Sequence, residues 1–588
     1  MAKVNIKIEG VPFEVDAGLT ILEAAKKCGF EIPSLCAFNH GECSKGSCRV
    51  CLVEVTGARG LVASCVYPVA EGMEITISSP KATAARRTSV ELLLSNHNKN
   101  CQQCEKNGKC ELLHVAKITG ARDDMYQGAQ TPVTVDRITP SIVRDTSKCI
   151  LCGRCVERCK NAHGLGVLGF EKRGFNTIVA PAENRSFANS PCILCGQCVS
   201  VCPTGALMEV SEIEKVDAAF KAGKYVVVQT APAVRAALGE EFDMPIGTLV
   251  TGKMVSALKR LGFKKVFDTN FAADLTIMEE ATELLSRVTN GGQLPMITSC
   301  SPGWVNYAEY YYGDLLGHLS SCKSPHEMFG AILKSYYAEK IGVDPKDMFV
   351  VSIMPCTAKK YEKERPELAV NGLRDVDAVL TTRELGKLIK RSGINFTKLP
   401  DSEFDNDIVG EYTGAGVIFG ATGGVMEAAL RTAAFKLTGE ELKKVELEDV
   451  RGLDGIKEAT YNLAGLEVKI AVAHGMKNAK VLLDQIRDGS SPYHFIEIMG
   501  CPGGCVAGGG QPYVKPCFLP NEEDDILDTF KAKRAAALYQ EDESKALRVS
   551  HKNPQIIELY EKFLGEPNSH KAHELLHTHY HAKERFSK

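Results

Sequence analysis

The segments CILCGRCVERC (residues 149–159) and CILCGQCVSVCP (residues 192–203) decide the fold of the first third of this chain. Each one spaces its cysteines as C-x2-C-x2-C-x3-C, and the second adds the proline of this signature. In iron–sulfur proteins with two such runs, the fourth cysteine of each run binds the cluster held mainly by the other. We therefore predict two [4Fe–4S] clusters with crossed ligand sets. The first set is Cys149, Cys152, Cys155 and Cys202, and the second is Cys192, Cys195, Cys198 and Cys159.

A second pattern lies nearer the N-terminus, where a close Cys-x2-Cys pair has one single cysteine before it and one after it. Its members are Cys36, Cys48, Cys51 and Cys65. Four thiolates in a strand-like segment fit a [2Fe–2S] cluster on a small β-rich domain. The alternative, a zinc ribbon, requires two paired Cys-x2-Cys knuckles. We interpret Cys43, in the same loop, as a bystander.

A third pattern joins one histidine to three cysteines in HNKNCQQCEKNGKC (residues 97–110). The candidate ligands are His97, Cys101, Cys104 and Cys110. Three thiolates and one imidazole can bind either zinc or a [4Fe–4S] cluster, and the pattern alone does not decide between them. A lone histidine is usually no ligand, but this one lies four residues before a cysteine run, which favours a metal site.

The composition places these sites in an ordinary globular protein. Of the 23 cysteines in 588 residues, 17 precede residue 203, which in a chain without a visible signal peptide indicates metal or redox chemistry rather than disulfides. The first residues alternate like a strand, and no uncharged run is apolar enough to span a membrane. A net charge of −3 gives no indication of nucleic-acid binding. We expect a cytoplasmic protein.

The chain changes character from about residue 212, where strand-like and helical runs alternate and predict an α/β domain of roughly 300 residues. Three loops in this region carry distinctive cysteines: PMITSCSPGW (residues 295–304), SIMPCTAKK (residues 352–360) and GCPGGCVAGGG (residues 500–510). Closely spaced glycines let a backbone approach a bulky group. Because thiolate-bound iron clusters carry electrons, a series of them should end at a catalytic centre, and these loops are the candidates.

Two other motifs have weaker functional interpretations. HGLGVLGF (residues 163–170) holds a formal G-x-G-x-x-G, but a dinucleotide site needs that motif between a strand and a helix. HELLH (residues 573–577) has the form of a zinc-protease motif, which requires a buried helix and a third ligand. It lies in a tail rich in histidine and lysine, so we predict an exposed terminal helix.

The three cysteine loops together resemble the signature loops of the [FeFe]-hydrogenases, or iron-only hydrogenases. The upstream patterns are similar, in order and spacing, to the accessory-cluster domains of the family's long form. That form includes the clostridial monomeric enzyme and the catalytic subunit of NAD(P)-linked multimeric hydrogenases. The tail ALYQEDESKALRVSHKNP (residues 537–554) resembles the family's small-subunit segment.

The resemblance implies a multidomain α/β fold, in which ferredoxin-type iron–sulfur domains precede a large α/β catalytic domain. Five parts are implied. They are a plant-ferredoxin-like [2Fe–2S] domain at 1–80, a [4Fe–4S] domain with one histidine ligand at 81–125, a two-[4Fe–4S] bacterial-ferredoxin-like domain at 126–211, the catalytic domain at 212–525 and a small-subunit-like segment at 526–588. The implied accessory cofactors are one [2Fe–2S] and three [4Fe–4S] clusters.

In this family the active site is the H-cluster, a [4Fe–4S] cubane joined through one cysteine sulfur to a two-iron unit. That unit carries CO, cyanide and a bridging dithiolate. By resemblance, Cys356, Cys501 and Cys505 bind the cubane, and Cys505 is the bridging ligand. The residues implied around the cluster are Lys359, which hydrogen-bonds a cyanide, together with Pro232, Ala233, Met354 and Met499.

Protons need a separate path to the cluster. On sequence alone, Glu280, Glu283 and Arg287 share one face of a helix, which is usually a solvated face of salt bridges. In the family, these carboxylates form a proton relay with Ser320 and a cysteine, which here is Cys300. Carboxylates and a thiol suit stepwise proton transfer.

The chain departs from the family at one position. The family has two adjacent cysteines, Thr-Ser-Cys-Cys-Pro, of which the first is the relay thiol and the second the fourth cubane ligand. Here Cys300 holds the first place and Ser301 the second. Serine is a poor substitute for a soft thiolate on iron. The fourth ligand is therefore Ser301, Cys300 or Cys322, and we favour the two cysteines.

The implied reaction is 2H⁺ + 2e⁻ ⇌ H₂, with electrons exchanged with ferredoxin or with partner subunits that bind flavin and NAD(P)H. One alternative is an electron-transfer subunit like the large iron–sulfur subunit of NADH dehydrogenase, which lacks the three C-terminal loops. The other is a low-turnover H₂-sensing relative, which the serine at position 301 keeps open.

Overall fold

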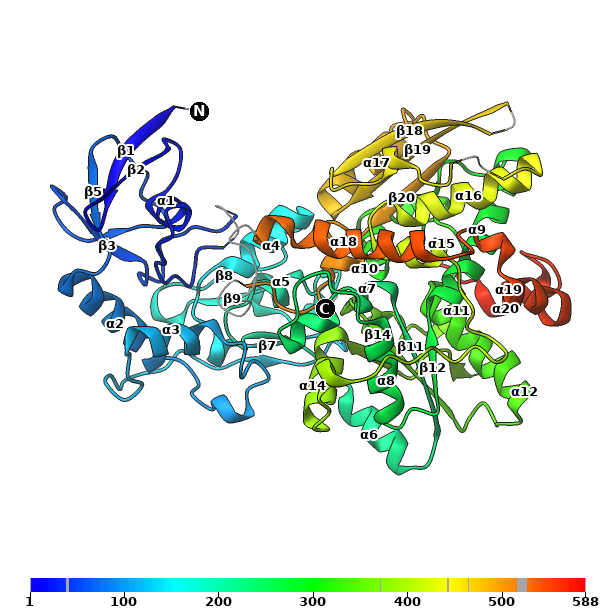
Figure 1. The fold of residues 1–588 in the computed structure, drawn as a ribbon, viewed down its shortest axis with the longest axis horizontal. Coiled ribbons are helices and arrows are strands. Elements are labelled where there is room, and N and C mark those ends of the chain that lie inside the picture. The colour runs from blue at the N-terminus through cyan, green and yellow to red at the C-terminus, as the bar shows by residue number, and fades with distance from the viewer. Residues whose placement is uncertain are drawn as a thin grey trace. The chain divides into compact units, whose positions relative to one another are not determined.

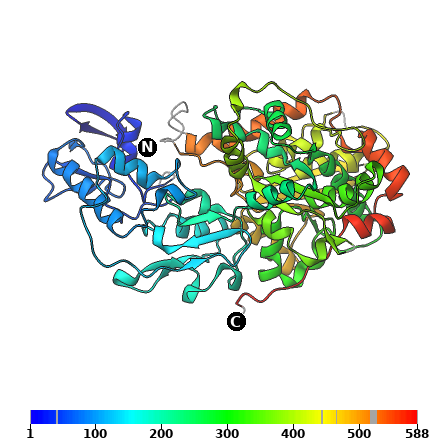
Figure 2. The ribbon, with the colours of Figure 1, turned by 90° about the horizontal axis from the view of Figure 1, so that it is seen from below.

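The computed structural model describes residues 2–38, 42–370, 372–441, 444–463, 465–515 and 526–586. The chain divides into two compact units, Met1–Ser190 with Gln197–Met208, and Pro191–Gly196 with Glu209–Lys588. Figure 1 and Figure 2 show that both units mix helices and sheets, as the sequence predicts. The boundaries of the five finer domains stay predictions.

The first unit begins with a five-stranded sheet in the order β2-β1-β5-β3-β4. Its strands are β1 (Lys3–Ile8), β2 (Val11–Asp16), β3 (Leu52–Val55), β4 (Val62–Ala63) and β5 (Met73–Thr76). The alternation read at the N-terminus forms the β1–β2 hairpin. Ile6 and Ile8 point into the core, and Lys7 on the opposite face pairs with exposed Glu74, 2.8 Å away.

Short helices and hairpins carry the other cysteine patterns of this unit. They are α1 (Ile21–Lys27), α2 (Pro80–Ser95), α3 (Glu111–Thr119), α4 (Arg154–His163), α5 (Gln197–Val201), β6 (Val135–Asp136) with β7 (Ile142–Asp145), and β8 (Gly169–Glu171) with β9 (Ile178–Ala180). α4 and α5 each begin inside a four-cysteine run and pack together. The G-x-G-x-x-G motif follows helix α4 and precedes strand β8, the reverse of a dinucleotide site.

The second unit is built on two four-stranded sheets, in the orders β12-β11-β14-β17 and β13-β20-β19-β18. The first is entirely parallel, with β11 (Tyr225–Thr230), β12 (Lys265–Asp268), β14 (Met348–Met354) and β17 (Ala378–Thr381). The second contains β13 (Met296–Ile297), β18 (Ile456–Leu463), β19 (Leu466–His474) and β20 (Phe495–Met499), of which only β18 is antiparallel to its neighbour. Parallel strands are covered on both faces, and β11, β14 and β17 are accordingly almost wholly buried.

Helices surround and connect these sheets. The main ones are α6 (Ile213–Lys221), α7 (Pro232–Arg235), α8 (Thr251–Arg260), α9 (Asn270–Thr289), α10 (Pro302–Tyr311), α11 (Pro325–Ile332), α13 (Ala358–Glu362), α14 (Thr382–Arg391), α16 (Gly424–Thr438) and α17 (Met476–Arg487). α9 contributes Phe271 and Leu275 to the core beside the first sheet, and Ala273 and Ile277 to the core beside the second. Because α9 has apolar residues on two faces, it is buried between the two cores. This packing fixes the positions of the polar residues further along α9.

The C-terminal segment of the second unit contains α18 (Ile526–Ser544), α19 (Pro554–Leu559) and α20 (His570–Leu576). Buried charges join it to the rest of the unit. Asp274 of α9 accepts hydrogen bonds from Ser550 (2.7 Å) and Asn553 (3.0 Å). Arg431 of α16 lies 2.6 Å from Glu427 and 3.0 Å from Asp542 of α18, and all three side chains are fully buried. The segment is therefore an integral part of this unit.

Replacing Arg431 by methionine should lower the free energy of unfolding by about 3 kcal/mol, the lower end of the cost of breaking a buried ion pair. Glu427 and Asp542 would lose their buried cation, and only the partly exposed Arg451 and Arg548 would remain to neutralise them. Chemical denaturation of the variant beside the wild-type protein measures this. The control is Arg487→Met, which removes an exposed ion pair with Asp314 and should cost less than about 1 kcal/mol. Equal losses in the two variants would contradict the prediction.

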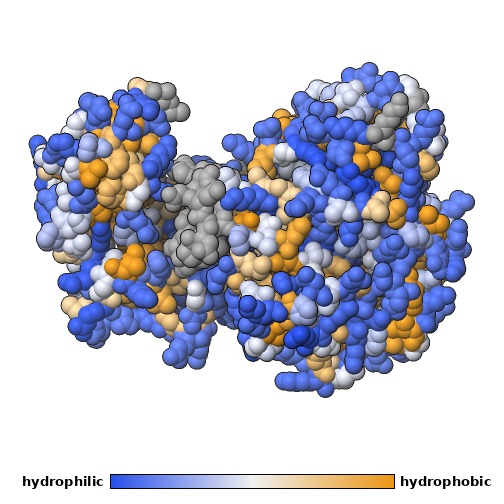
Figure 3. Space-filling view, in the orientation of Figure 1, coloured by the Kyte–Doolittle hydropathy of each residue, from blue (hydrophilic) through white to orange (hydrophobic). Residues whose placement is uncertain are grey.

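Hydrophilic residues cover most of the face of each unit that Figure 3 shows. Among the residues that the structure describes, no helix combines the length and the apolar character needed to cross a bilayer.

Candidate metal centre

One buried cavity in the second unit collects the cysteine loops that the sequence singles out. The space free of protein atoms there, including the part open to solvent, is about 760 Å³. Its polar and sulfur-bearing lining includes Cys300, Ser301, Cys356, Lys359, Cys501, Cys505, Met354 and Met499. Pro232 also lines it, whereas Ala233 is buried behind Pro232 with its carbonyl oxygen accepting a hydrogen bond from Gln511 (2.9 Å). The structure thus brings together residues from four distant stretches of the chain.

The two sheets explain this convergence. Pro232 follows β11 and Cys356 follows β14 of the first sheet, while Cys300 follows β13 and Cys501 follows β20 of the second. Each residue therefore lies just past the carboxyl end of a parallel strand, where α/β sheets bind their ligands.

The glycines of the 500–510 loop allow it to lie against neighbouring backbone. A Cβ atom added to Gly508 would lie 2.2 Å from the carbonyl oxygen of Pro355, which only glycine avoids. Gly504 has a φ of +93°, a conformation that side-chain-bearing residues rarely adopt. These close approaches bring the loop of Cys501 and Cys505 against the loop of Cys356.

Cys300, Ser301 and Cys322 lie in different surroundings. Ser301 Oγ accepts a hydrogen bond from the backbone N–H of Gly500 (3.1 Å), the residue before Cys501. Burial raises the pKa of the Cys300 thiol well above its usual range, and the nearby Glu280 carboxylate raises it further. Cys322 is not among the described residues that line the cavity; it lines a smaller one nearby, with Sγ 3.9 Å from Glu283 Oε2.

Lys359 is held at the cavity wall by a buried carboxylate that the sequence analysis did not identify. Its Nζ lies 2.7 Å from Glu362 Oε2, which also lies 2.7 Å from Nε2 of His326. Burial opposes the charge of Lys359, but Glu362 outweighs it and keeps the pKa of Lys359 above its usual value. The i,i+3 spacing of Lys359 and Glu362 is the signal that could have found this residue.

We expect Glu362→Gln to lower the activity of this centre by roughly 10–100-fold, the usual cost of removing a residue that orients a group around a metal site. Lys359 would lose its counter-ion and its position at the cavity wall. The matched control is Glu364→Gln, two residues away, which removes contacts with Lys363 and Arg374. Steady-state assays of both variants, normalised to iron content, measure the difference. An equal loss in both would contradict the prediction.

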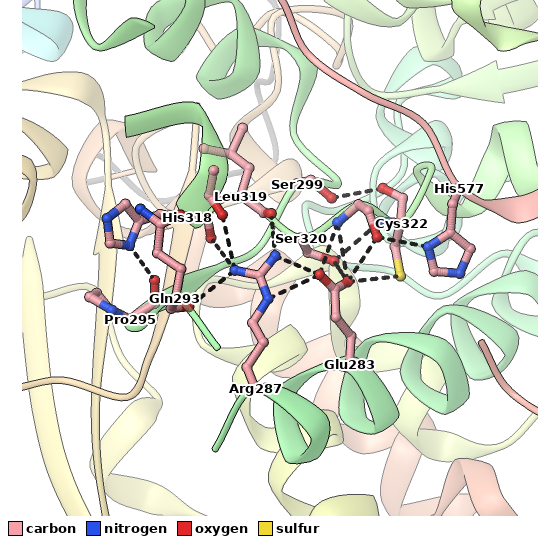
Figure 4. Close-up of polar contacts among 12 residues, drawn as sticks. Glu283, Arg287, Gln293, Pro295, Ser299, His318, Leu319, Ser320, Cys322 and His577 are labelled. Atoms are coloured by element: carbon pink, nitrogen blue, oxygen red, sulfur yellow. Dashed lines mark hydrogen bonds and ion pairs between the residues drawn. The ribbon is translucent and has the colours of Figure 1, made fainter. Parts of the chain in front are cut away.

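Arg287, Glu283 and Ser320 of the candidate proton relay form a connected set of side chains (Figure 4). Arg287 donates to Glu283 Oε1 at 2.6 Å, and Ser320 Oγ donates to Glu283 Oε2 at 3.0 Å. Ser320 also hydrogen-bonds Glu280, which acts electrostatically on Cys300 at the cavity wall. The sequence alone predicts a solvated face with salt bridges, and this prediction fits only Glu283 and Arg287, which are partly exposed. Glu280 does not fit it, because its side chain is 2% exposed.

Glu280 is the strongly perturbed carboxyl of this set. Burial raises its pKa to about 8, with a further contribution from the charge of Glu283. A carboxyl group whose pKa lies near neutrality can take up and release protons under ordinary conditions.

The prediction of an exposed helix at HELLH is wrong for its last three residues, since Leu575, Leu576 and His577 are all buried. His577 is 7% exposed, and its Nδ1 lies 2.8 Å from Ser321 Oγ (Figure 4). Its Nε2 lies 3.0 Å from Glu279 Oε2, and Ser321 donates from its backbone N–H to Glu283 at 3.1 Å. Because His577 and Glu279 are 298 residues apart in the chain, no local sequence pattern could have revealed this contact.

The donor sets of the first unit also converge. The thiol of Cys36 hydrogen-bonds those of Cys48 and Cys65, and Cys65 also bonds Cys51. Cys43 is also buried, and its Sγ lies 3.9 Å from the carbonyl oxygen of Cys152. This arrangement of four sulfurs without Cys43 fits a [2Fe–2S] cluster.

The first unit has a cavity lined by Cys149, Cys152, Cys155 and Cys202. These are the members of the first crossed ligand set. His97, at 8% exposed, has an Nδ1 without a hydrogen-bond partner among the described residues. Such a buried nitrogen fits a metal ligand, since a buried polar atom otherwise costs free energy.

The run from Cys192 to Cys202 is divided between the two units, and its ligand set stays a prediction. Within the second unit, Leu194 accepts a hydrogen bond through its carbonyl oxygen from Thr357 Oγ1 (2.7 Å). Since Leu194 precedes Cys195 and Thr357 follows Cys356, this contact brings an accessory cysteine loop to a cavity loop.

Models of known families match nearly the whole chain. Residues 224–509 match the C-terminal domain of the iron only hydrogenase large subunit, and residues 528–583 match the iron hydrogenase small subunit. Upstream, residues 1–80 match a 2Fe-2S iron-sulfur cluster binding domain, 86–124 the iron-sulfur binding region of NADH-ubiquinone oxidoreductase-G, and 148–206 a 4Fe-4S dicluster domain.

Full-length relatives agree with these matches. The NADP-reducing hydrogenase subunit HndD of Solidesulfovibrio fructosivorans is 50% identical over 100% of both chains. Iron hydrogenase 1 of Clostridium pasteurianum is 45% identical over 98% of this chain and 99% of its own. A solved structure of the [FeFe]-hydrogenase HydA1 from Chlamydomonas reinhardtii is 45% identical, with a TM-score of 0.56 over 63% of this chain and 99% of that one. With its cysteine loops gathered at one cavity and these relatives along its whole length, the chain belongs to the iron-only hydrogenase family.

Proposed function

We propose that this protein interconverts H₂ with protons and electrons, 2H⁺ + 2e⁻ ⇌ H₂, at an H-cluster in the cavity of the second unit. One observation carries the proposal: cysteines from three separate loops line one buried cavity with Lys359. When bound, the cluster supplies the iron at which H₂ is made or split. The donor set fits it, since soft thiolates select iron–sulfur clusters.

Cys356, Cys501 and Cys505 would hold the cubane, and Lys359 would donate a hydrogen bond to the two-iron unit, with its CO, cyanide and dithiolate. For the fourth ligand, we propose Ser301, whose hydroxyl lines the cavity beside Gly500. This differs from our sequence-based preference for Cys300 or Cys322. Cys322 lines another cavity, and Cys300, which lines the same cavity as Ser301, is the residue that the family resemblance implies as the relay thiol. Cys300 then stays available to carry protons.

The chain's own residues would move the proton. Arg287 and Glu283 lie partly exposed, so a proton can enter there from water. Ser320 passes it to Glu280, and Glu280 to Cys300 at the cavity wall. The hydrophobic shell, including Met354 and Met499, excludes water from the remainder of the cavity.

Electrons would travel through one [2Fe–2S] and three [4Fe–4S] accessory clusters in the first part of the chain. The relative named as an NADP-reducing hydrogenase subunit supports partner subunits that exchange electrons with NADP(H), and ferredoxin is the other candidate partner. We place the protein in the cytoplasm. An electron-transfer subunit is not favoured, because the matches to hydrogenase models cover residues 224–509 and 528–583.

Infrared spectra and H₂ assays of anaerobically matured protein test this function. We expect CO and cyanide bands together with H₂ evolution from a reduced dye. Bands accompanied by turnover that is negligible beside a clostridial-type enzyme would support the H₂-sensing alternative instead. Loss of both the bands and the activity would overturn the proposal.

A further inference from the structure

Arg154 occupies a central position among the cysteine loops of the first unit. It lies on α4, between Cys152 and Cys155, and is only 3% exposed. Arginine side chains are rarely buried unless they are paired, so this position calls for a physical reason.

The contacts of Arg154 reach two other cysteine patterns. Its Nη1 donates to both carboxylate oxygens of Glu111, at 2.8 and 2.9 Å, and Glu111 directly follows Cys110. Its guanidinium also lies 5.4 Å from the ring centroid of Phe38, two residues after Cys36. One side chain therefore touches the loop of the [2Fe–2S] pattern and the helix that follows the histidine-containing pattern.

The charge of Arg154 also acts on its own cysteine run. The Arg154 backbone N–H hydrogen-bonds the sulfur of Cys152. The residue that carries this charge is two positions after Cys152 and directly before Cys155, so the charge lies close to this ligand set. Arg154 Nε is buried and has no hydrogen-bond partner among the described residues, so Glu111 is its one carboxylate partner there.

We propose that the buried Arg154–Glu111 ion pair sets the reduction potential of the cluster held by Cys149, Cys152, Cys155 and Cys202. This inference rests on the accessory clusters of the proposed function. In each transfer the cluster accepts one electron, becomes more negative by one charge, and passes that electron on without a proton. A nearby buried cation favours the reduced cluster and raises its potential, while a nearby carboxylate lowers it.

The sign of each substitution follows from this electrostatic reasoning. Arg154→Gln removes a positive charge and leaves Glu111 negative, so the potential of this cluster should fall. Glu111→Gln leaves Arg154 without its counter-charge, so the potential should rise, and that of the cluster beside Cys110 should rise with it. The double variant should return close to the wild-type potential.

Potentiometric measurements followed by electron paramagnetic resonance on the full-length, cluster-loaded protein test the inference. The signal of this cluster is identified by its loss in Cys152→Ser. In Arg154→Gln we expect the ratio of reduced to oxidised cluster at a fixed potential to fall about tenfold, or about 59 mV for a one-electron couple. Glu111→Gln should shift it by a similar factor in the opposite direction.

Two controls separate charge from packing. Arg158 lies at the same 5.4 Å from the ring centroid of Phe38 but pairs with Glu42. Arg158→Gln therefore removes a comparable stacking contact. The ratio of reduced to oxidised cluster at the fixed potential should stay within about threefold of the wild-type ratio. Arg154→Lys keeps the charge and should also preserve the potential.

Equal shifts in Arg154→Lys and Arg154→Gln would overturn the inference, because packing would then account for both. So would an unshifted potential in Arg154→Gln and Glu111→Gln. Wild-type protein that lacks this cluster signal would overturn both the inference and the accessory-cluster assignment, whereas unshifted potentials with all signals present leave the proposed function intact.

Discussion

Replacing Glu280 by glutamine should lower H₂ turnover by roughly 10²–10⁴-fold, the range by which a positioned acid or base accelerates proton transfer. Glu280 is buried between Ser320 and Cys300, and a glutamine there cannot release a proton to the cavity. Because the cluster ligands are unchanged, the infrared bands of CO and cyanide should remain. Assays and infrared spectra of one preparation measure both quantities.

The matched control is Glu279→Gln on the same helix. Glu279 is also fully buried, but it bonds Tyr560 and His577 instead of Ser320, so its replacement should affect stability more than turnover. If Glu280→Gln kept more than half of the wild-type activity, the relay would not pass through this residue.

The pH profile gives a second test of the same residue. Because burial raises the pKa of Glu280 to about 8, the group is protonated below that pH and can donate toward the cavity. H₂ evolution should therefore decline as the pH rises through about 8, while H₂ oxidation, which needs a carboxylate to accept the proton, should increase over the same interval. Profiles in both directions that show no inflection in this range would contradict the assignment.

Ser301→Ala should reduce both the cubane signal in electron paramagnetic resonance and H₂ turnover by at least about 100-fold, since loss of a ligand should exceed the cost of losing an outer residue. Ser301→Cys should retain or strengthen the signal, because a soft thiolate suits iron better than a hydroxyl. Cys322→Ala should keep the full signal, because Cys322 lines a different cavity.

Ser299→Ala is the matched control for the hydroxyl at position 301. Ser299 lies in the same loop, but its Oγ donates to the carbonyl oxygen of Cys322 at 2.8 Å. The cubane signal should survive this change. A Ser301→Ala protein with an intact signal, beside a Cys322→Ala protein without one, would reverse the ligand assignment.

The sequence reveals features that short-range spacing encodes. A ferredoxin-type run fixes four cysteines within eleven residues, and Glu280 and Glu283 are three apart on one helix, so local geometry brings them together. The parallel sheets follow from alternating apolar strands and helices. The cavity at their carboxyl ends is predicted only through family resemblance, because nothing local ties residues 300, 356 and 501 together.

Long-range contacts explain what the sequence could not predict. Cys322 is a reasonable ligand because it is two residues after Ser320, but its backbone pairs with that of His577 and its sulfur lies 3.9 Å from Glu283 Oε2. The polar tail around His577 predicts an exposed side chain, yet the imidazole of His577 pairs with the buried Glu279 on α9. Such pairings depend on how the C-terminal segment packs, which no spacing rule contains.

The attachment of that segment has a genetic consequence. Asp274 and Glu279 of α9 bind it through Ser550, Asn553, Tyr560 and His577, all by side-chain contacts between separate stretches of chain. None of these bonds requires a peptide link between the two parts. A gene divided ahead of residue 526 would thus encode two polypeptides that retain the contacts needed to associate. Gene fission at this point is therefore compatible with the assembled fold.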